Sequence, residues 1–181
     1  MNARELRTTP VDLTASKKIR KNPITIICDN VLDTYNVGAI FRLADAVAAE
    51  KVYLCGATET PPNSKIKKAS INTWQWVNWQ YAETAIAVIF RLRQYYGGQA
   101  NAKCQIVAVE QDKRSKPFDK VEYKFPLAVI VGNETYGVSK EILDIADEIV
   151  ELPMCGVNKS LNVMVSCGIV LYKIIQRVCP E

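Results

Sequence analysis

The stretch ELPMCGVNKSLNVMVSCGIVLYKII (residues 151–175) joins two apolar runs through a small polar island, residues 158–162. The second run has helical spacing, and Ser160 or Asn158 at its start can cap the helix by accepting hydrogen bonds from unpaired first-turn amides. One such residue is enough for a cap. The island contains an asparagine, a lysine, a serine and a second asparagine, so capping alone does not account for it.

The helix that follows the island is apolar on nearly all sides. Its positions form two apolar stripes and one narrow polar seam: Leu161, Val165, Ile169 and Tyr172; Val163, Cys167, Val170 and Ile174; and Asn162, Ser166, Lys173 and Arg177. Such a helix needs cover beyond one sheet face. In so small a domain we expect a second subunit to supply that cover; the alternative is a central helix of a monomer.

The rest of the chain alternates strand and helix patterns. Short β-branched runs predict strands at 24–30, 51–56, 104–110, 127–133 and 148–153, and helical spacing is found at 37–50, 82–96 and 139–146. Residues 57–81 are basic and aromatic without a regular pattern. This alternation predicts an α/β fold with a mostly parallel sheet and helices on both faces.

Composition narrows the possible chemistry. The 181 residues suit one domain, 49% are hydrophobic, and histidine is absent, which excludes Ser-His-Asp triads, HExxH zinc sites and imidazole bases. Most of the six cysteines lie in apolar runs without CxxC spacing, so we expect reduced core residues. With no signal peptide or membrane-length apolar run, we expect a cytoplasmic protein that does not enter membranes.

Positive charge is concentrated in two places, although the net charge is only +4. Six basic residues crowd the first 21 positions, and SKIKKAS adds three: Arg4, Arg7, Lys17, Lys18, Arg20 and Lys21; Lys65, Lys67 and Lys68. Such clusters attract phosphates, whereas an ordinary solvated surface is the plain alternative.

Polar residues follow three predicted strands. In YNVGAIFR, Asn36 starts a helix and Arg42 can reach back over Gly38, which suits a phosphate, although an ion pair with Asp45 or Glu50 is an equal alternative. The second site is the glycine-bounded turn GNETYG (residues 132–137), and the third is the island at 158–162. Because ligands of open α/β sheets collect at the carboxyl ends of the strands, we expect one composite pocket.

The segments NVGAIFR, LAVIVGNETYG and ELPMCGVNKSLNV, in this order, resemble the three motifs of the SpoU/TrmH family of RNA ribose 2′-O-methyltransferases, within the SPOUT superfamily. The resemblance implies a methyltransferase domain at 24–181 after a basic N-terminal extension at 1–23. It also implies a C-terminal deep trefoil knot that binds S-adenosylmethionine, a homodimer, and a reaction that needs no metal.

The resemblance assigns roles position by position. The catalytic positions would be Asn36, Arg42, Glu134, Ser160 and Asn162, and the cofactor-binding positions Val109, Glu110, Gly132, Leu152, Met154 and Leu161. The motif-one arginine is a proposed base in this family. A guanidinium is a poor proton acceptor at neutral pH, so a phosphate clamp that also stabilises charge on the ribose oxygen is the safer role for Arg42.

The substrate is expected to be RNA, with tRNA preferred and rRNA possible. Two alternatives stay open: a catalytically silent, knotted RNA-binding dimer, and a SPOUT enzyme that methylates a base. The run INTWQWVNWQY (residues 71–81) has two interpretations as well. Its tryptophans can stack on unpaired bases beside the lysines, or Trp74 and Trp76 can form one face of a strand that packs on the core or on a dimer partner.

Overall fold

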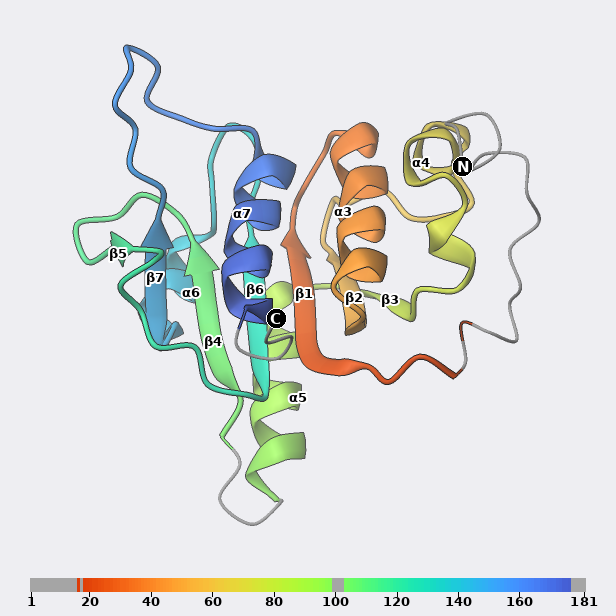
Figure 1. Cartoon of the computed structure of the whole chain (residues 1–181), viewed down its shortest axis with the longest axis horizontal. Coiled ribbons are helices and arrows are strands. Elements are labelled where there is room, and N and C mark those ends of the chain that lie inside the picture. The colour runs from red at the N-terminus through yellow and green to blue at the C-terminus, as the bar shows by residue number, and fades with distance from the viewer. Residues whose placement is uncertain (1–15, 17, 99–102, 177–181) are drawn as a thin grey trace.

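A seven-stranded sheet forms the centre of the molecule (Figure 1). The computed structural model describes residues 16, 18–98 and 103–176. The strands are β1 (Asn22–Asp29), β2 (Ala49–Cys55), β3 (Trp79–Ala82), β4 (Gln105–Val109), β5 (Lys116–Pro117), β6 (Leu127–Val131) and β7 (Glu148–Glu151). Their spatial order is β3-β2-β1-β6-β4-β7-β5, and every pairing between them is parallel. The predicted α/β fold is confirmed.

Alternating side chains divide the core between the two faces of the sheet. In β6, Leu127 and Val129 belong to one cluster, and Ala128 and Ile130 belong to the other. Helices α3, α4 and α7 cover the first face and α5 and α6 the second (Figure 1). Their bounds are α3 (Thr34–Ala46), α4 (Ser64–Ser70), α5 (Ala85–Gly97), α6 (Lys140–Ile145) and α7 (Val163–Ile175).

Helix α3 begins and ends earlier than its apolar spacing predicts. Asp33 caps its start by accepting a 2.8 Å hydrogen bond from the Tyr35 amide. At the other end the chain turns at Ala48, which has a φ of 48°, and β2 begins at the next residue. The sequence pattern continued to Glu50 because the alanines at 46, 48 and 49 suit either structure.

The segment without a regular pattern contains α4, a 3-10 turn η1 (Thr73–Gln75) and β3. The prediction that Trp74 and Trp76 share one face of a strand is wrong, because they lie in and just after the 3-10 turn. All three tryptophans are partly buried against the core, and Trp76 Nε1 donates a 2.8 Å hydrogen bond to Asp45 Oδ1. The core interpretation is therefore the one the packing supports.

Helix α7 is capped by Asn162, and not by Ser160 or Asn158. Asn162 Oδ1 accepts hydrogen bonds from the amides of Met164 and Val165, at 3.0 and 3.4 Å. One predicted apolar stripe is buried against the sheet, with Val163 at its edge. The other is open to solvent along its length: Leu161 (41% exposed), Val165 (37%), Ile169 (36%) and Tyr172 (52%). Arg177 lies outside the described residues.

The cysteines of the described region are free thiols. Cys28, Cys55, Cys104 and Cys167 are buried, as predicted, and burial raises the pKa of the last three to about 12. The prediction is wrong for Cys155, which is exposed. Cys179 lies outside the described residues, as do Arg4, Arg7 and Lys17. None of the described helices has the length and apolarity that crossing a membrane requires.

Candidate active site

Three residues from three distant segments form one hydrogen-bonded chain. Asn162 Nδ2 donates to Asn36 Oδ1 at 3.1 Å, and Asn36 Nδ2 donates to Glu134 Oε1 at 2.9 Å. Asn162 caps α7, Asn36 lies buried in the first turn of α3, and Glu134 follows β6. The structure thus brings together one residue from each of the three predicted polar sites.

Glu134 also holds the chain that leads into α3. Its two carboxylate oxygens accept hydrogen bonds from the amides of Leu32 and Asp33, both at 3.0 Å. Partial burial opposes ionisation of this carboxyl, but the hydrogen bonds from Asn36 and the two amides outweigh it and lower the pKa of Glu134. Glu134 is therefore a charged anchor with both oxygens engaged, which makes it a poor proton acceptor.

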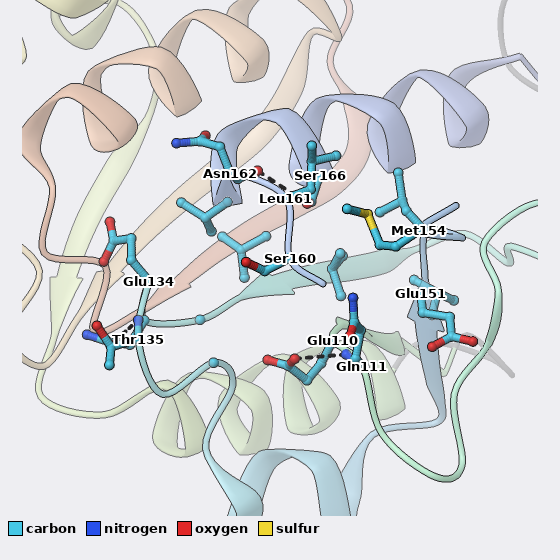
Figure 2. Close-up of a pocket in the computed structure, with 18 of the residues that line it drawn as sticks. Glu110, Gln111, Glu134, Thr135, Glu151, Met154, Ser160, Leu161, Asn162 and Ser166 are labelled. Atoms are coloured by element: carbon cyan, nitrogen blue, oxygen red, sulfur yellow. Dashed lines mark hydrogen bonds between the residues drawn. The ribbon is translucent and has the colours of Figure 1, made fainter. Parts of the chain in front are cut away.

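A cavity of about 410 Å3 opens at the carboxyl ends of β4, β6 and β7. Figure 2 shows Glu134 and Asn162 at one end of the cavity and Met154 and Glu151 at the other. All six residues predicted to bind the cofactor line it, together with three of the predicted catalytic residues: Val109, Glu110, Gly132, Leu152, Met154 and Leu161; Glu134, Ser160 and Asn162. Its volume lies in the range of small-molecule sites.

The turn after β6 forms one wall of the cavity, and its main chain packs closely against itself. A Cβ at Gly132 would collide with the main chain of Gly137 and Val138, so only glycine fits there. Glu110 also holds this turn, because its Oε2 accepts a 2.8 Å hydrogen bond from the Val138 amide. Its Oε1 accepts a 2.8 Å hydrogen bond from the amide of the next residue, Gln111. Glu110 thus contributes to the shape of the cavity through its contacts with the main chain.

The opposite wall is the segment 152–161, most of which is exposed. Within the described chain, its only hydrogen bond runs from Gln111 Nε2 to the Lys159 carbonyl, at 2.6 Å. The other backbone N–H and C=O groups of the segment have no hydrogen-bond partner among the described residues, and Leu152, Met154 and Leu161 place apolar side chains among them. Such a wall suits a flat heterocycle that hydrogen-bonds to the main chain, as an adenine ring does.

Ser160 and Arg42 stand apart from the hydrogen-bonded chain. Ser160 lines the cavity and its hydroxyl contacts no hydrogen-bonding partner in the described region. Arg42 is exposed on α3 and does not line the cavity. The ion-pair alternative for Arg42 is wrong, because no salt bridge joins it to Asp45 or to Glu50. Asp45 accepts a hydrogen bond from Trp76, and Glu50 accepts one of 2.9 Å from the Tyr96 hydroxyl.

Two residues of the site escaped the sequence-based prediction. Asn133 Oδ1 accepts from the amides of Thr135 and Tyr136, and its Nδ2 donates 2.9 Å to the Asn30 carbonyl. An asparagine directly after a glycine is a common turn former, so that signal was present. Gln111 has no comparable signal, because its partner is a main-chain carbonyl 48 residues away. In the described residues, no cluster of carboxylates and cysteines could hold a metal ion.

Comparison with curated proteins finds methyltransferases. The tRNA (guanosine(18)-2′-O)-methyltransferase of Aquifex aeolicus is 36% identical over 157 residues, covering 85% of this chain and 69% of that protein. The enzyme of the same name from Escherichia coli strain K12 is 29% identical over 157 residues, covering 85% of this chain and 63% of the relative.

Solved structures share the fold. A TrmH/SpoU tRNA modifying enzyme of A. aeolicus matches with a TM-score of 0.77 and 33% identity, over 91% of this chain and 79% of its own. An AdoMet-bound rRNA methyltransferase from Sinorhizobium meliloti matches with a TM-score of 0.77 and 25% identity, over 91% of this chain and 60% of its own.

The family itself is identified by a match that spans most of the chain. The model of the SpoU rRNA methylase family matches residues 23–172, a range that includes all three segments of the hydrogen-bonded chain and the whole cavity wall. The resemblance of the three motifs is thereby confirmed. The chain belongs to the SpoU rRNA methylase family.

Proposed function

We propose that this protein is an S-adenosylmethionine-dependent RNA methyltransferase that modifies a ribose 2′-hydroxyl, with tRNA as the preferred substrate class. The observation that carries the proposal is the chain Asn162–Asn36–Glu134 at one end of a cavity with an adenine-compatible wall. Relatives named as tRNA 2′-O-methyltransferases and the AdoMet-bound neighbour support it. The deep trefoil knot and the domain bounds 1–23 and 24–181 stay predictions that belong to the same proposal, as does a cytoplasmic location.

Different residues of the cavity would contact different parts of the cofactor. The main chain of 152–161, with Leu152, Met154 and Leu161, would hold the adenine, and Val109, Glu110 and Gly132 would shape the opposite side. When bound there, S-adenosylmethionine supplies an electrophilic methyl group on a sulfonium. The charged carboxylates of Glu134 and Glu151 on the cavity wall favour a cationic ligand over a neutral one of the same shape.

The chain's own polar groups would position the ribose. In the transfer a bond forms between the ribose oxygen and the methyl carbon, the carbon–sulfur bond breaks with its electron pair staying on sulfur, and one proton is released. Ser160, with its free hydroxyl in the cavity, would orient the attacking hydroxyl. Arg42, which is exposed, lacks an ion-pair partner among the described residues and lies nearly two turns along α3 from Asn36, would bind the adjacent phosphate and stabilise negative charge on the oxygen.

The second subunit proposed for this enzyme would cover the open stripe of α7. Its four residues, Leu161, Val165, Ile169 and Tyr172, form one exposed apolar face on a helix whose other side is buried. A second copy fits this face, because an isologous contact would bury the same stripe on both chains. Leu161 also lines the cavity, so the contact would adjoin the proposed cofactor site.

Methyl transfer with labelled cofactor tests the proposal. We expect label in tRNA, in dinucleotides that resist alkaline hydrolysis, because a 2′-O-methyl group blocks cleavage of the neighbouring linkage. Label in rRNA alone would change the substrate class, and label in alkali-labile mononucleotides would indicate a base methyltransferase. RNA binding without transfer would identify a silent binding protein. Arg42→Ala should abolish transfer while calorimetric cofactor affinity stays within about twofold, since Arg42 lies outside the cavity.

A further inference from the structure

A basic surface lies on α4, on the side of α3 away from α7 (Figure 1). We define it by Lys65, Lys67 and Lys68, which are all exposed. None of the three ammonium groups makes a hydrogen bond or ion pair with another described residue. Five exposed lysines elsewhere each lie within 3.4 Å of a carboxylate: Lys103, Lys116, Lys120, Lys124 and Lys140. Other exposed lysines of the described chain, such as Lys113 and Lys159, also lack an ion pair, so what distinguishes the α4 surface is that three unpaired lysines lie within four residues of one helix.

Helix α4 is held rigidly against the element that carries Asn36. Ile66 and Ser70 are fully buried, and a Cβ at Gly38 would come within 2.5 Å of the Ala69 Cβ and 3.0 Å of the Ile66 carbonyl. Asn63 caps α4 through 2.9 and 3.2 Å hydrogen bonds to the first amides. The three ammonium groups are thus presented from a fixed position next to the first turns of α3.

Arg42 lies along the seam between α3 and the α4 surface. Gly38 contacts α4, and Asp45 contacts Trp76 just after η1. Residues spaced by four and three share one helix face, so Arg42, between them, emerges on that side of α3. Helices in contact are about 8–10 Å apart, so α4 lies one helix spacing from α3, whose Asn36 hydrogen-bonds to the cavity residues Glu134 and Asn162.

Acidic residues are sparse in the segment that carries this surface. Between Gly56 and Asn78 the only one is Glu59. The three tryptophans that follow the lysines in the sequence are packed against the core, whereas Tyr81 near the end of β3 is exposed. Charge, which suits phosphates, is therefore what this surface offers, since its tryptophans are not free to stack on bases.

We propose that Lys65, Lys67 and Lys68 hold the RNA backbone that flanks the target ribose, and that Arg42 connects this phosphate track to the active site. The proposal rests on the proposed RNA methyltransferase function. It adds the direction of the bound strand, which would leave the cavity across α3 toward α4. Because the lysines touch neither the cavity nor the cofactor wall, they act on RNA affinity and not on the chemical step.

A matched pair of triple variants tests the track. The first combines Lys65→Gln, Lys67→Gln and Lys68→Gln. The control combines Lys116→Gln, Lys120→Gln and Lys124→Gln, which removes the same charge from paired lysines. We expect the first to raise the KM for bulk tRNA at least about tenfold and to reduce the slope of log affinity against log salt by about 2. Its kcat at saturating RNA, its cofactor affinity and its Tm should match those of the control.

The outcomes are separable. Equal losses in both variants would reduce the effect to net charge, and an unchanged KM and salt slope in the first would remove α4 from the RNA site. If the wild-type protein transferred no methyl group to any RNA, the proposed function would fail first. In that case fluorescence anisotropy with labelled tRNA still tests the surface, because weaker binding by the first variant alone supports it and equal binding by all three proteins overturns it.

Discussion

The side chain of Asn162 makes hydrogen bonds to two parts of the structure, whereas that of Ser160 makes none among the described residues. The side-chain oxygen Oδ1 of Asn162 caps α7 by accepting from the Met164 and Val165 amides, and its Nδ2 donates to Asn36 Oδ1. Removing it therefore breaks a helix cap and the polar chain together. Ser160 faces the cavity without a partner among the described residues, so its hydroxyl is available to a substrate. Substitutions of Ser160 and Asn162 should therefore separate effects on turnover from effects on stability.

We predict that Ser160→Ala lowers kcat by about 100-fold, the cost of losing one positioned transition-state contact, and leaves Tm unchanged. Asn162→Ala should lower kcat similarly and also cost about 1 kcal/mol of stability for the lost cap, or roughly 2–4 °C in Tm. Single-turnover rates and melting curves measure both. A normal rate for Ser160→Ala would show that its hydroxyl does not touch the ribose.

Glu134 links the site to pH. Its folded pKa is below the ordinary value of 4.5, so the unfolded carboxyl binds a proton first as the pH falls. The stabilisation by Glu134 is thus complete above about pH 4.5 and is lost as the pH falls through the folded pKa. Glu134→Gln should be destabilising by about 1 kcal/mol at pH 7, a value reduced for its exposure. The difference in Tm from wild type should shrink below pH 4.5, and a constant difference would contradict the hydrogen-bonded carboxylate.

At the scale of elements, Gln111 fastens one cavity wall to the other. Its 2.6 Å hydrogen bond to the Lys159 carbonyl is the one that ties segment 152–161 to the rest of the described chain. Gln111→Ala should raise the cofactor Kd about five- to tenfold through faster dissociation, the scale of one net hydrogen bond. The kcat at saturating cofactor should change little. Stopped-flow dissociation rates measure this effect, and an unchanged rate would show that the wall is held otherwise.

Trp76 tests whether its segment belongs to the core. Trp76→Ala removes partly buried ring area and the hydrogen bond to Asp45, and should cost about 2–3 kcal/mol, or roughly 5–10 °C in Tm. Trp76→Phe should recover the packing but not the hydrogen bond. Below the melting transition, both variants should bind tRNA like wild type. Weaker RNA binding with an unchanged melting curve would contradict the core interpretation and support base stacking by Trp76.

The sequence predicted the elements whose patterns are regular and the sites that lie at their ends. The β-branched runs located β1, β4 and β6, and the six residues that the motif resemblance assigned to cofactor binding all line the cavity. It did not predict α4, because only Ile66 and Ser70 face the core in a seven-residue helix, too few for a period. It also chose the wrong cap for α7, since any of three polar residues in the island could begin that helix.

At the scale of the whole molecule, different sets of helices cover the two faces of the sheet. Helices α5 and α6 cover one face, and α3, α4 and α7 cover the other (Figure 1). The apolar stripe of α7 is exposed to solvent. Helix α4, which carries the basic surface, lies on the side of α3 away from α7 (Figure 1). A second copy on α7 and an RNA strand on α4 would therefore use different sides of the same helical layer.

Ile169 lies at the centre of the exposed α7 stripe, so Ile169→Asp should separate the subunits of the proposed dimer. An uncompensated carboxylate in a buried apolar contact is costly on both chains of an isologous interface. We expect wild type to sediment at twice the chain mass of 20.3 kDa and the variant to sediment at 20.3 kDa. The matched control is Phe90→Asp, an equally drastic change of an exposed apolar residue on α5, which should stay dimeric. Because Leu161 belongs both to the stripe and to the cavity, the monomeric variant should also bind the cofactor more weakly.

A wild-type protein that stays monomeric at micromolar concentration, or a dimeric Ile169→Asp variant, would show that α7 does not form the interface.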